Sequence, residues 1–167
     1  MKRPSISGKP SVNAAATGAD PMEEPAAAVI PRAAASACIF RGDTVLLVQR
    51  GKAPNQGRWS LPGGSIESGE RAIDAATREV AEETGVVAAL TGVVDVNDVI
   101  CRNEAGTLTH HYVVMVFVGL GTGDPVAASD AIAAAFVPLQ DVDGLAVGRR
   151  VHAIIMTAWE TQRLHTG

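Results

Sequence analysis

Apolar and polar residues first fall into a regular pattern at residues 35–40 and 44–49, where two apolar, partly β-branched runs stand on either side of Arg41-Gly42-Asp43. Runs of this length and composition are typical of β-strands, and glycine next to aspartate suits a tight turn between two of them. The pattern therefore predicts a β-hairpin. A polar loop at residues 51–58 and a short strand at residues 59–61 are expected to follow it.

The clearest helix is predicted over residues 72–84. Ser68 precedes it as a candidate N-terminal cap, and Gly85 follows it at the position where a left-handed residue commonly ends a helix. At about 100° per residue, several of its side chains share one arc, which is expected to face the core. These residues are Ile73, Ala76, Thr77, Val80 and Thr84.

The second half of the chain predicts more strands and a closing helix. Strand-like runs cover residues 86–102, 109–120 and 133–137, and apolar positions at helical spacing predict a helix over residues 147–165. Strands around one central helix, with another helix at the end of the chain, favour an α/β fold in which helices cover both faces of a mixed sheet.

The chain has 167 residues, a length that suits a single domain. Residues 1–31 are rich in proline, serine, glycine and alanine without a sustained period, so we expect a disordered N-terminal tail ahead of a domain spanning residues 32–167. Met22 offers an alternative start, and the pattern is compatible with either a native tail or a leader.

The overall composition narrows the range of partners. The formal net charge is −4, which argues against general affinity for nucleic acid polymers or anionic membranes, because both bind basic surfaces. No run reaches the ~18 apolar residues that a membrane-spanning helix needs. Cys38 and Cys101 lie in apolar, strand-like runs, so we expect buried, reduced thiols and a cytoplasmic protein.

An acidic cluster lies at the end of the helix predicted for residues 72–84. With Glu79 as the origin, Glu82 lies at about −60° and Glu83 at about +40° around the helix axis, so the three carboxylates share one face. Negative charge at a helix C-terminus opposes the macrodipole, and neighbouring carboxylates repel one another. A hard divalent cation such as Mg²⁺ or Mn²⁺ removes both conflicts, and an ordinary solvated acidic face is the alternative interpretation.

The loops before this helix offer groups for a phosphorylated ligand. Gly63 and Gly64 allow their backbone to approach a ligand closely, and the Gly64 carbonyl is a further candidate metal ligand. Arg50 and Arg58 flank the polar loop and are candidates to bind phosphate, with surface solvation as the alternative for each.

Residues 63–86 resemble the Nudix box, G-x5-E-x7-R-E-U-x-E-E-x-G-U, in which U is a bulky apolar residue. The resemblance implies a Nudix-type α/β/α sandwich, with a mixed β-sheet between helices, and an enzyme that hydrolyses the diphosphate linkage of a nucleoside diphosphate derivative. The specified positions are filled by Gly64, Glu70, Arg78, Glu79, Val80, Glu82, Glu83, Gly85 and Val86.

The same resemblance implies roles for individual residues. Glu79, Glu82 and Glu83, together with the Gly64 carbonyl, would bind Mg²⁺ or Mn²⁺. These glutamates and Arg78 would form the catalytic group.

Other roles implied by the resemblance are structural or left open. Glu70 and Arg78 would pair and hold the loop against the helix, and Gly85 would be a structural position of the box. The general base is either a box glutamate or an acid from a distant loop. The loop candidates are Glu104, Asp124 and Asp130.

The implied substrate is a nucleotide-type small molecule. Pro54, Gly57, Trp59 and the later Ser129-Asp130-Ala131 look like compact ADP-ribose or nucleotide-sugar pyrophosphatases, whereas the absence of proline from residue 87 to residue 124 does not. One alternative function is a sanitising pyrophosphatase for modified nucleoside triphosphates. A second alternative is a non-catalytic nucleotide-sensing module. A homodimer is compatible with the resemblance.

Two histidines and two tryptophans complete the list of candidates. His110 and His111 are adjacent in a predicted strand, so only one of them can face a given side of the sheet and contact a substrate there. We expect Trp59 to pack beside the box and Trp159 to lie in the core.

Overall fold

The computed structural model describes residues 28–52 and 55–166 of the chain. Most of the tail predicted for residues 1–31, and the alternative start at Met22, lie outside this part. The described residues 28–31 have no regular secondary structure and lead directly into the first strand.

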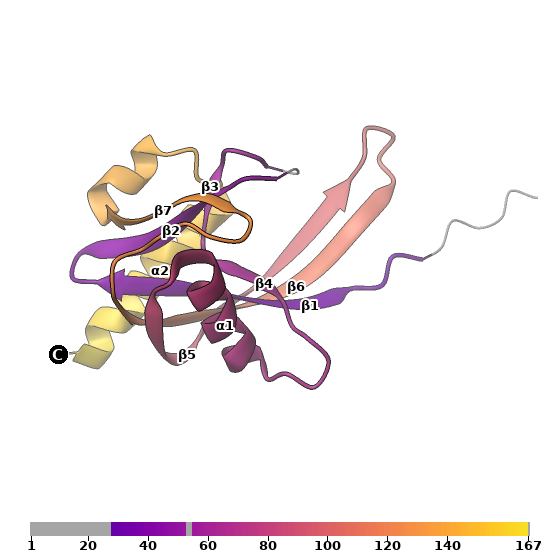
Figure 1. Cartoon of the computed structure of the whole chain (residues 1–167). Helices are drawn as coiled ribbons and strands as arrows, with labels where there is room; N and C mark the ends of the chain where they lie inside the picture. The colour runs from indigo at the N-terminus through magenta and orange to yellow at the C-terminus, as the bar shows by residue number, and fades with distance from the viewer. Residues whose placement is uncertain (1–27, 53–54, 167) are drawn as a thin grey trace, which may run out of the picture.

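A mixed sheet forms the centre of the molecule (Figure 1). Its strands in the described part of the chain are β1 (Arg32–Arg41), β2 (Thr44–Arg50), β3 (Trp59–Ser60), β4 (Gly63–Ser65), β5 (Val87–Arg102), β6 (Leu108–Thr122) and β7 (Ala131–Pro138). The main order is β3-β2-β1-β6-β5, and β4 pairs with β1 whereas β7 pairs with β2. β1 and β6 are parallel, and the other described pairs are antiparallel.

Helices cover both faces of this sheet (Figure 1). They are α1 (Ala72–Thr84) and α2 (Arg149–Thr166), and a short 3-10 helix, η1 (Leu139–Gly144), precedes α2. The α/β class with a mixed sheet between helices is therefore confirmed.

Alternating side chains of β1 show how the two layers form. Ala37 and Ile39 pack in the core layer that also contains Val80 of α1, whereas Cys38 and Phe40 belong to the layer that contains residues of α2. This alternation follows from the two-residue period of a strand, and it places β1 at the centre of both cores.

The bounds of α1 match the prediction, but its start differs from what the sequence suggested. Gly85 ends the helix in the left-handed region, at φ 68°, and its N–H donates to the Ala81 carbonyl. The prediction that Ser68 caps the other end is wrong. Arg71 occupies the N-cap position, and in the described structure no side chain caps the helix there.

The buried arc of α1 is also rotated from the predicted one. Thr77 was expected to face the core but is exposed, and its hydroxyl donates to the Ile73 carbonyl. Ala75 is fully buried instead. Ile66, in the segment before the helix, packs in the same core layer as Ala75, which explains why that side of the helix is covered.

The β5–β6 hairpin is long and extends away from the body of the sheet (Figure 1). Both cysteines are free thiols, and Cys38 is buried as predicted, whereas Cys101 on this hairpin is only half-buried.

Among the described residues, no helix combines the length and the apolar character that crossing a membrane requires.

Candidate functional site

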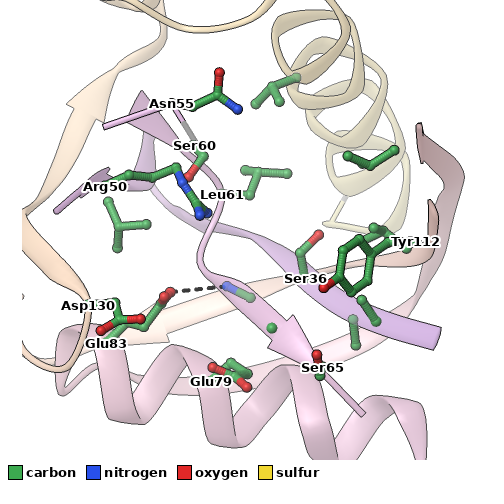
Figure 2. A pocket seen from close by; sticks show the side chains of 18 of the residues that line it. Ser36, Arg50, Asn55, Ser60, Leu61, Ser65, Glu79, Glu83, Tyr112 and Asp130 are labelled. Carbon is green, nitrogen blue, oxygen red and sulfur yellow. Dashed lines mark hydrogen bonds between the residues drawn. The ribbon is translucent and has the colours of Figure 1, made fainter. Parts of the chain in front are cut away.

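The second half of α1 turns two carboxylates toward β4. Glu79 and Glu83 are one helical turn apart, and both line the same cavity. The backbone N–H of Gly63 donates a hydrogen bond of 3.1 Å to Glu83 Oε2 (Figure 2). This bond ties β4 to the end of the helix and fixes the orientation of one acid.

Close packing explains the two glycines of β4. A Cβ atom at Gly63 would lie 2.5 Å from both the Ala35 carbonyl oxygen and Ser36 Cβ of β1. A Cβ atom at Gly64 would lie 2.5 Å from the carboxyl carbon of Glu79. Neither distance is compatible with ordinary van der Waals contact. A side chain at Gly63 would push β4 away from β1, and one at Gly64 would displace the Glu79 carboxylate.

The guanidinium of Arg78 organises the other side of the acidic group. Its Nε and Nη2 donate to the two carboxylate oxygens of Glu70, at 2.9 and 3.0 Å, and Nη2 also donates to the Ser65 carbonyl. Its Nη1 donates to Glu79 at 2.8 Å and to Glu82 at 3.2 Å. The pKa of Glu70 lies below its usual value chiefly because of the hydrogen bonds from Arg78.

Glu83 is held in an environment that disfavours its charge. Burial raises the pKa of Glu83 to about 7, the Gly63 N–H lowers it, and the negative charges of Glu79 and Asp130 raise it further. Arg50 acts in the opposite direction, so its positive charge reaches the same point. Carboxylates perturbed in this way are typical of sites that bind cations or move protons.

These residues belong to a cavity of about 700 Å³, which lies within the ~300–1,000 Å³ range of ligand pockets. One end gathers the charged residues Arg50, Lys52, Glu79, Glu83 and Asp130. The other end lies on the β5–β6 hairpin and contains Asn97, Val99, Cys101, His110 and Tyr112. Figure 2 shows Glu79, Glu83 and Asp130 together on one wall and Tyr112 on another.

A family model described as NUDIX domain matches residues 30–158. The chain belongs to the Nudix family. The match extends well beyond the box, over the sheet and most of α2, and it confirms the family resemblance seen in the sequence.

Individual relatives give the same result. The chain is 32% identical over 117 residues to an ADP-ribose pyrophosphatase of Methanocaldococcus jannaschii, a match that covers 70% of this chain and 67% of the relative. It is 47% identical over 72 residues to a putative 8-oxo-dGTP diphosphatase 2 of Mycobacterium tuberculosis, covering 42% of this chain and about half, 51%, of that relative.

The solved structures support the fold. A MutT NUDIX hydrolase from Burkholderia pseudomallei superimposes with a TM-score of 0.66 at 26% identity, covering 77% of this chain and 98% of that one. Together with the pyrophosphatase names of the relatives, the family model identifies the Nudix domain of this chain as that of a pyrophosphohydrolase.

The structure brings some of the box residues to the cavity and leaves others outside its described lining. Glu79, Glu83, Gly63 and Gly64 line it. Glu82 does not: its side chain is 53% exposed and turns to Arg78, whereas the side chain of Glu79 is 16% exposed. The three carboxylates therefore do not converge on one point in this conformation.

Only some of the candidate phosphate-binding arginines and candidate bases line the cavity. Arg50 lines the cavity, whereas Arg58 is exposed and lies outside its described lining. Asp130 lines the cavity as well. Glu104 lies in the turn of the β5–β6 hairpin, and Asp124 faces Arg41 at 3.7 Å, so both are outside the same lining.

The histidines and tryptophans follow the strand and helix patterns. His110 lines the cavity, whereas His111 faces the other side of the sheet and contacts Asp98 at 3.1 Å. Trp159 packs against Phe40 with ring centroids 5.3 Å apart, and Trp59 packs against the same core layer, as expected for both.

Nudix hydrolases generally use divalent cations, and the donor chemistry of this wall fits such an ion. Glu79, Glu83 and the backbone of Gly64 offer oxygen atoms, which Mg²⁺ and Mn²⁺ prefer. Among residues 28–52 and 55–166, however, no three His, Cys, Asp or Glu side chains gather closely enough to form a complete ion site. Glu82 contacts Arg78 and lies outside the described lining of the cavity.

Sequence reasoning missed several residues of the cavity. Lys52 lines it and forms an ion pair with Asp130. Asn55 also lines it, and so does Ser129, which the sequence indicated only as part of a pattern similar to ADP-ribose pyrophosphatases. These are the two non-glycine residues of the described chain with positive φ, at 68° and 56°. Such backbone conformations concentrate at functional loops, but a single sequence does not reveal them.

Proposed function

We propose that the chain hydrolyses the diphosphate linkage of a nucleoside diphosphate derivative, with Mg²⁺ or Mn²⁺ as its cofactor. The observation that carries this proposal is the meeting of Glu79, Glu83 and Asp130 on one cavity wall, beside the backbone of Gly63 and Gly64. Carboxylates from α1 and from the turn before β7 thus face a space large enough for a nucleotide.

Glu79 and Glu83, with the Gly64 carbonyl, would hold the cation, and Glu82 would join them once released from Arg78. The cation supplies positive charge that offsets the diphosphate and makes a water molecule a better nucleophile at neutral pH.

The chain's own residues bind and orient the reactants. Arg50 lies close enough to lower the pKa of Glu83, and its planar guanidinium suits bidentate contact with a phosphate. Lys52 holds Asp130 at the cavity wall. We assign Asp130 as the proton acceptor for the attacking water, with Glu83 as the alternative because a base is most effective when its pKa lies near the working pH. Arg58 has no role in this proposal.

The relatives favour two substrate classes. The relative named ADP-ribose pyrophosphatase matches over 70% of this chain, which supports ADP-ribose or a nucleotide sugar. The relative named putative 8-oxo-dGTP diphosphatase 2 has the higher identity, 47%, over a shorter stretch, which supports a modified nucleoside triphosphate as the second candidate. A cytoplasmic location, a homodimer and the absence of nucleic acid and membrane partners remain predictions.

A release assay tests the proposal and chooses between the substrates. The purified chain is incubated with Mg²⁺ and ADP-ribose, a nucleotide sugar or 8-oxo-dGTP, and the products are separated by chromatography. Glu83→Gln and Asp130→Asn should each lower kcat by about 10²- to 10⁴-fold. Glu160→Gln, an exposed acid on α2, is the matched control and should retain full activity.

Equal rates in the wild type and Glu83→Gln would refute the assignment of the site. Hydrolysis that proceeds equally well in the presence of a chelator would refute the requirement for a divalent cation. If only Asp130→Asn retained activity, Glu83 would take over the role of proton acceptor.

A further inference from the structure

The end of the cavity away from the acids is one face of the β5–β6 hairpin, which we call the hairpin arm. Strand pairing places Cys101 opposite His110 and Val99 opposite Tyr112. All four residues, with Asn97, line the cavity. The hairpin arm thus offers ring faces, an amide and a thiol, where the other end offers charges.

Aromatic side chains give the hairpin arm a flat surface. The rings of His110 and Tyr112 are nearly parallel, with 7° between their planes and 6.3 Å between their centroids. The guanidinium of Arg32 lies 5.7 Å from the Tyr112 centroid. Figure 2 shows Tyr112 across the cavity from Glu79, with its hydroxyl directed inward. Tyr112 is half-buried and His110 is exposed, and aromatic rings at such positions bind other planar rings by stacking.

Asn97 adds a directional group to the same wall. Arg150 of α2 donates to Asn97 Oδ1 at 3.1 Å and to Asp95 Oδ1 at 2.7 Å. Because arginine can only donate, this contact fixes which end of the amide faces α2. The NH₂ group of Asn97 is then the end that can donate to a ligand in the cavity.

We propose that the hairpin arm is a subsite for a planar heteroaromatic ring of the substrate, which stacks on Tyr112 and accepts a hydrogen bond from the Asn97 amide. The inference rests on the proposed function, because the charged end must hold the diphosphate while the ring reaches the hairpin. A nucleobase meets both requirements, since it has a flat face and acceptors on its edge. A second sugar has no aromatic face to stack, so Tyr112 favours the base over a sugar.

Cys101 provides a direct reporter of the hairpin arm. It lines the cavity and is half-buried, whereas Cys38 is fully buried, so alkylation of the native protein should be confined to Cys101. Iodoacetamide labelling is followed by peptide mass spectrometry. Adenosine 5′-monophosphate should slow labelling by at least about fivefold, whereas ribose 5-phosphate at the same concentration should not, because it has no aromatic ring to stack on Tyr112.

Variants connect this protection to turnover. Tyr112→Ala should abolish the protection and raise KM for the diphosphate substrate by about 5- to 150-fold with little change in kcat. Tyr112→Phe keeps the ring and should keep both properties. Asn97→Asp keeps an oxygen for Arg150 but loses the donor, so it should also raise KM. His111→Ala is the matched control, because the neighbouring side chain faces Asp98 on the other side of the sheet.

The outcomes separate the subsite from the proposed function. Equal protection by the nucleotide and by ribose 5-phosphate overturns the subsite, and so does an unchanged KM in both Tyr112→Ala and Asn97→Asp. If Tyr112→Ala does not fold, judged by circular dichroism, Asn97→Asp and the labelling of the wild type still decide. Selective protection by the nucleotide in a wild type that hydrolyses no diphosphate would remove the proposed function and leave a ring-binding site.

Discussion

Burial raises the pKa of Glu83 from 4.5 to about 7, so below neutral pH the cation-free folded protein favours the protonated side chain. In the unfolded chain the side chain has its ordinary pKa of 4.5, so it loses the proton at a lower pH. Between these two values the folded state binds more protons than the unfolded state, and the free energy of unfolding falls as the pH rises. The acid that we assign to the site therefore destabilises the fold at neutral pH until a cation is bound.

Unfolding by urea in the presence of chelator, at pH 5 and pH 8, measures this effect. Between the two pH values the wild type should lose up to about 2.5 kcal/mol relative to Glu83→Gln, since each pKa unit corresponds to ~1.4 kcal/mol. Glu83→Gln should thus be more stable than the wild type at pH 8 while being inactive. Glu160→Gln should follow the wild type. A difference between wild type and Glu83→Gln that is the same at both pH values would contradict the prediction.

The role of Arg78 depends on the planar, forked shape of its guanidinium as well as on its charge. Its guanidinium reaches both oxygens of Glu70, the carboxylate of Glu79 and the Ser65 carbonyl at the same time. A lysine keeps the charge but has a single nitrogen, so Arg78→Lys should lower the free energy of unfolding by about 1–3 kcal/mol and reduce activity by freeing Glu79. Arg71→Lys, at an exposed site with one weak contact to Asp74 at 4.0 Å, is the control. Equal urea midpoints for both variants would contradict the assigned role.

At the scale of elements, the short strand β4 has two glycines that serve different neighbours. An added Cβ at Gly63 meets β1, at the Ala35 carbonyl and Ser36 Cβ, whereas an added Cβ at Gly64 meets the flexible end of Glu79. Gly63→Ala should therefore separate β4 from β1 and cost about 1–3 kcal/mol of stability. Gly64→Ala should retain the melting temperature but lose activity, because the Glu79 carboxylate moves aside.

The comparison needs a glycine whose substitution meets no neighbour. Gly92 of β5 has no described atom within 4 Å of an added Cβ, so Gly92→Ala should change neither property. Thermal melts and the release assay on the three variants decide the matter. A Gly64→Ala protein that is active and unstable would reverse the assignment of the two glycines.

Local patterns predicted α1 well because its signals lie within a few residues of one another. The left-handed Gly85 and the bounds of the helix follow from neighbours in the chain. The direction of the Glu82 side chain depends instead on its contact with Arg78. The cap failed because Glu70 accepts from the Glu67 N–H and Gly69 has φ +84°, so a turn continues past Ser68 before the helix begins. That turn depends on a side chain three residues away, which the helical pattern does not show.

At the scale of the whole molecule, the two ends of the cavity were not equally predictable. Most of the acidic end comes from one continuous stretch, so a single motif contained it. The hairpin end depends on register: the β5 ladder shifts between Val93 and Asp95, and beyond that bulge Asn97 and Cys101 face the cavity. The orientation of Asn97 depends further on Arg150 of α2, which is distant in the chain. The alternation of apolar and polar residues along a strand predicts neither the position of a bulge nor a partner that is distant in the chain.

The strand β1 begins four residues after the described part of the chain starts. Arg32 is the first residue of β1 and pairs in parallel with Tyr112 of β6, and Ala35 is fully buried. The described residues ahead of Arg32 contribute no buried side chain. Removal of residues 1–27 should therefore leave both the melting temperature and the hydrolysis rate unchanged.

A longer truncation provides the contrast. Removal of residues 1–36 also deletes half of β1, which leaves Tyr112 and the following residues of β6 without their parallel partner and removes Ala35 from the core. Unpaired backbone and lost burial in the central strand should abolish folding, visible as loss of the cooperative melt. A melting temperature lowered by the first truncation would show that residues 1–27 contribute to the fold. Because β1 joins the acids of α1 to the ring wall of β6, activity should be lost together with the cooperative melt rather than before it.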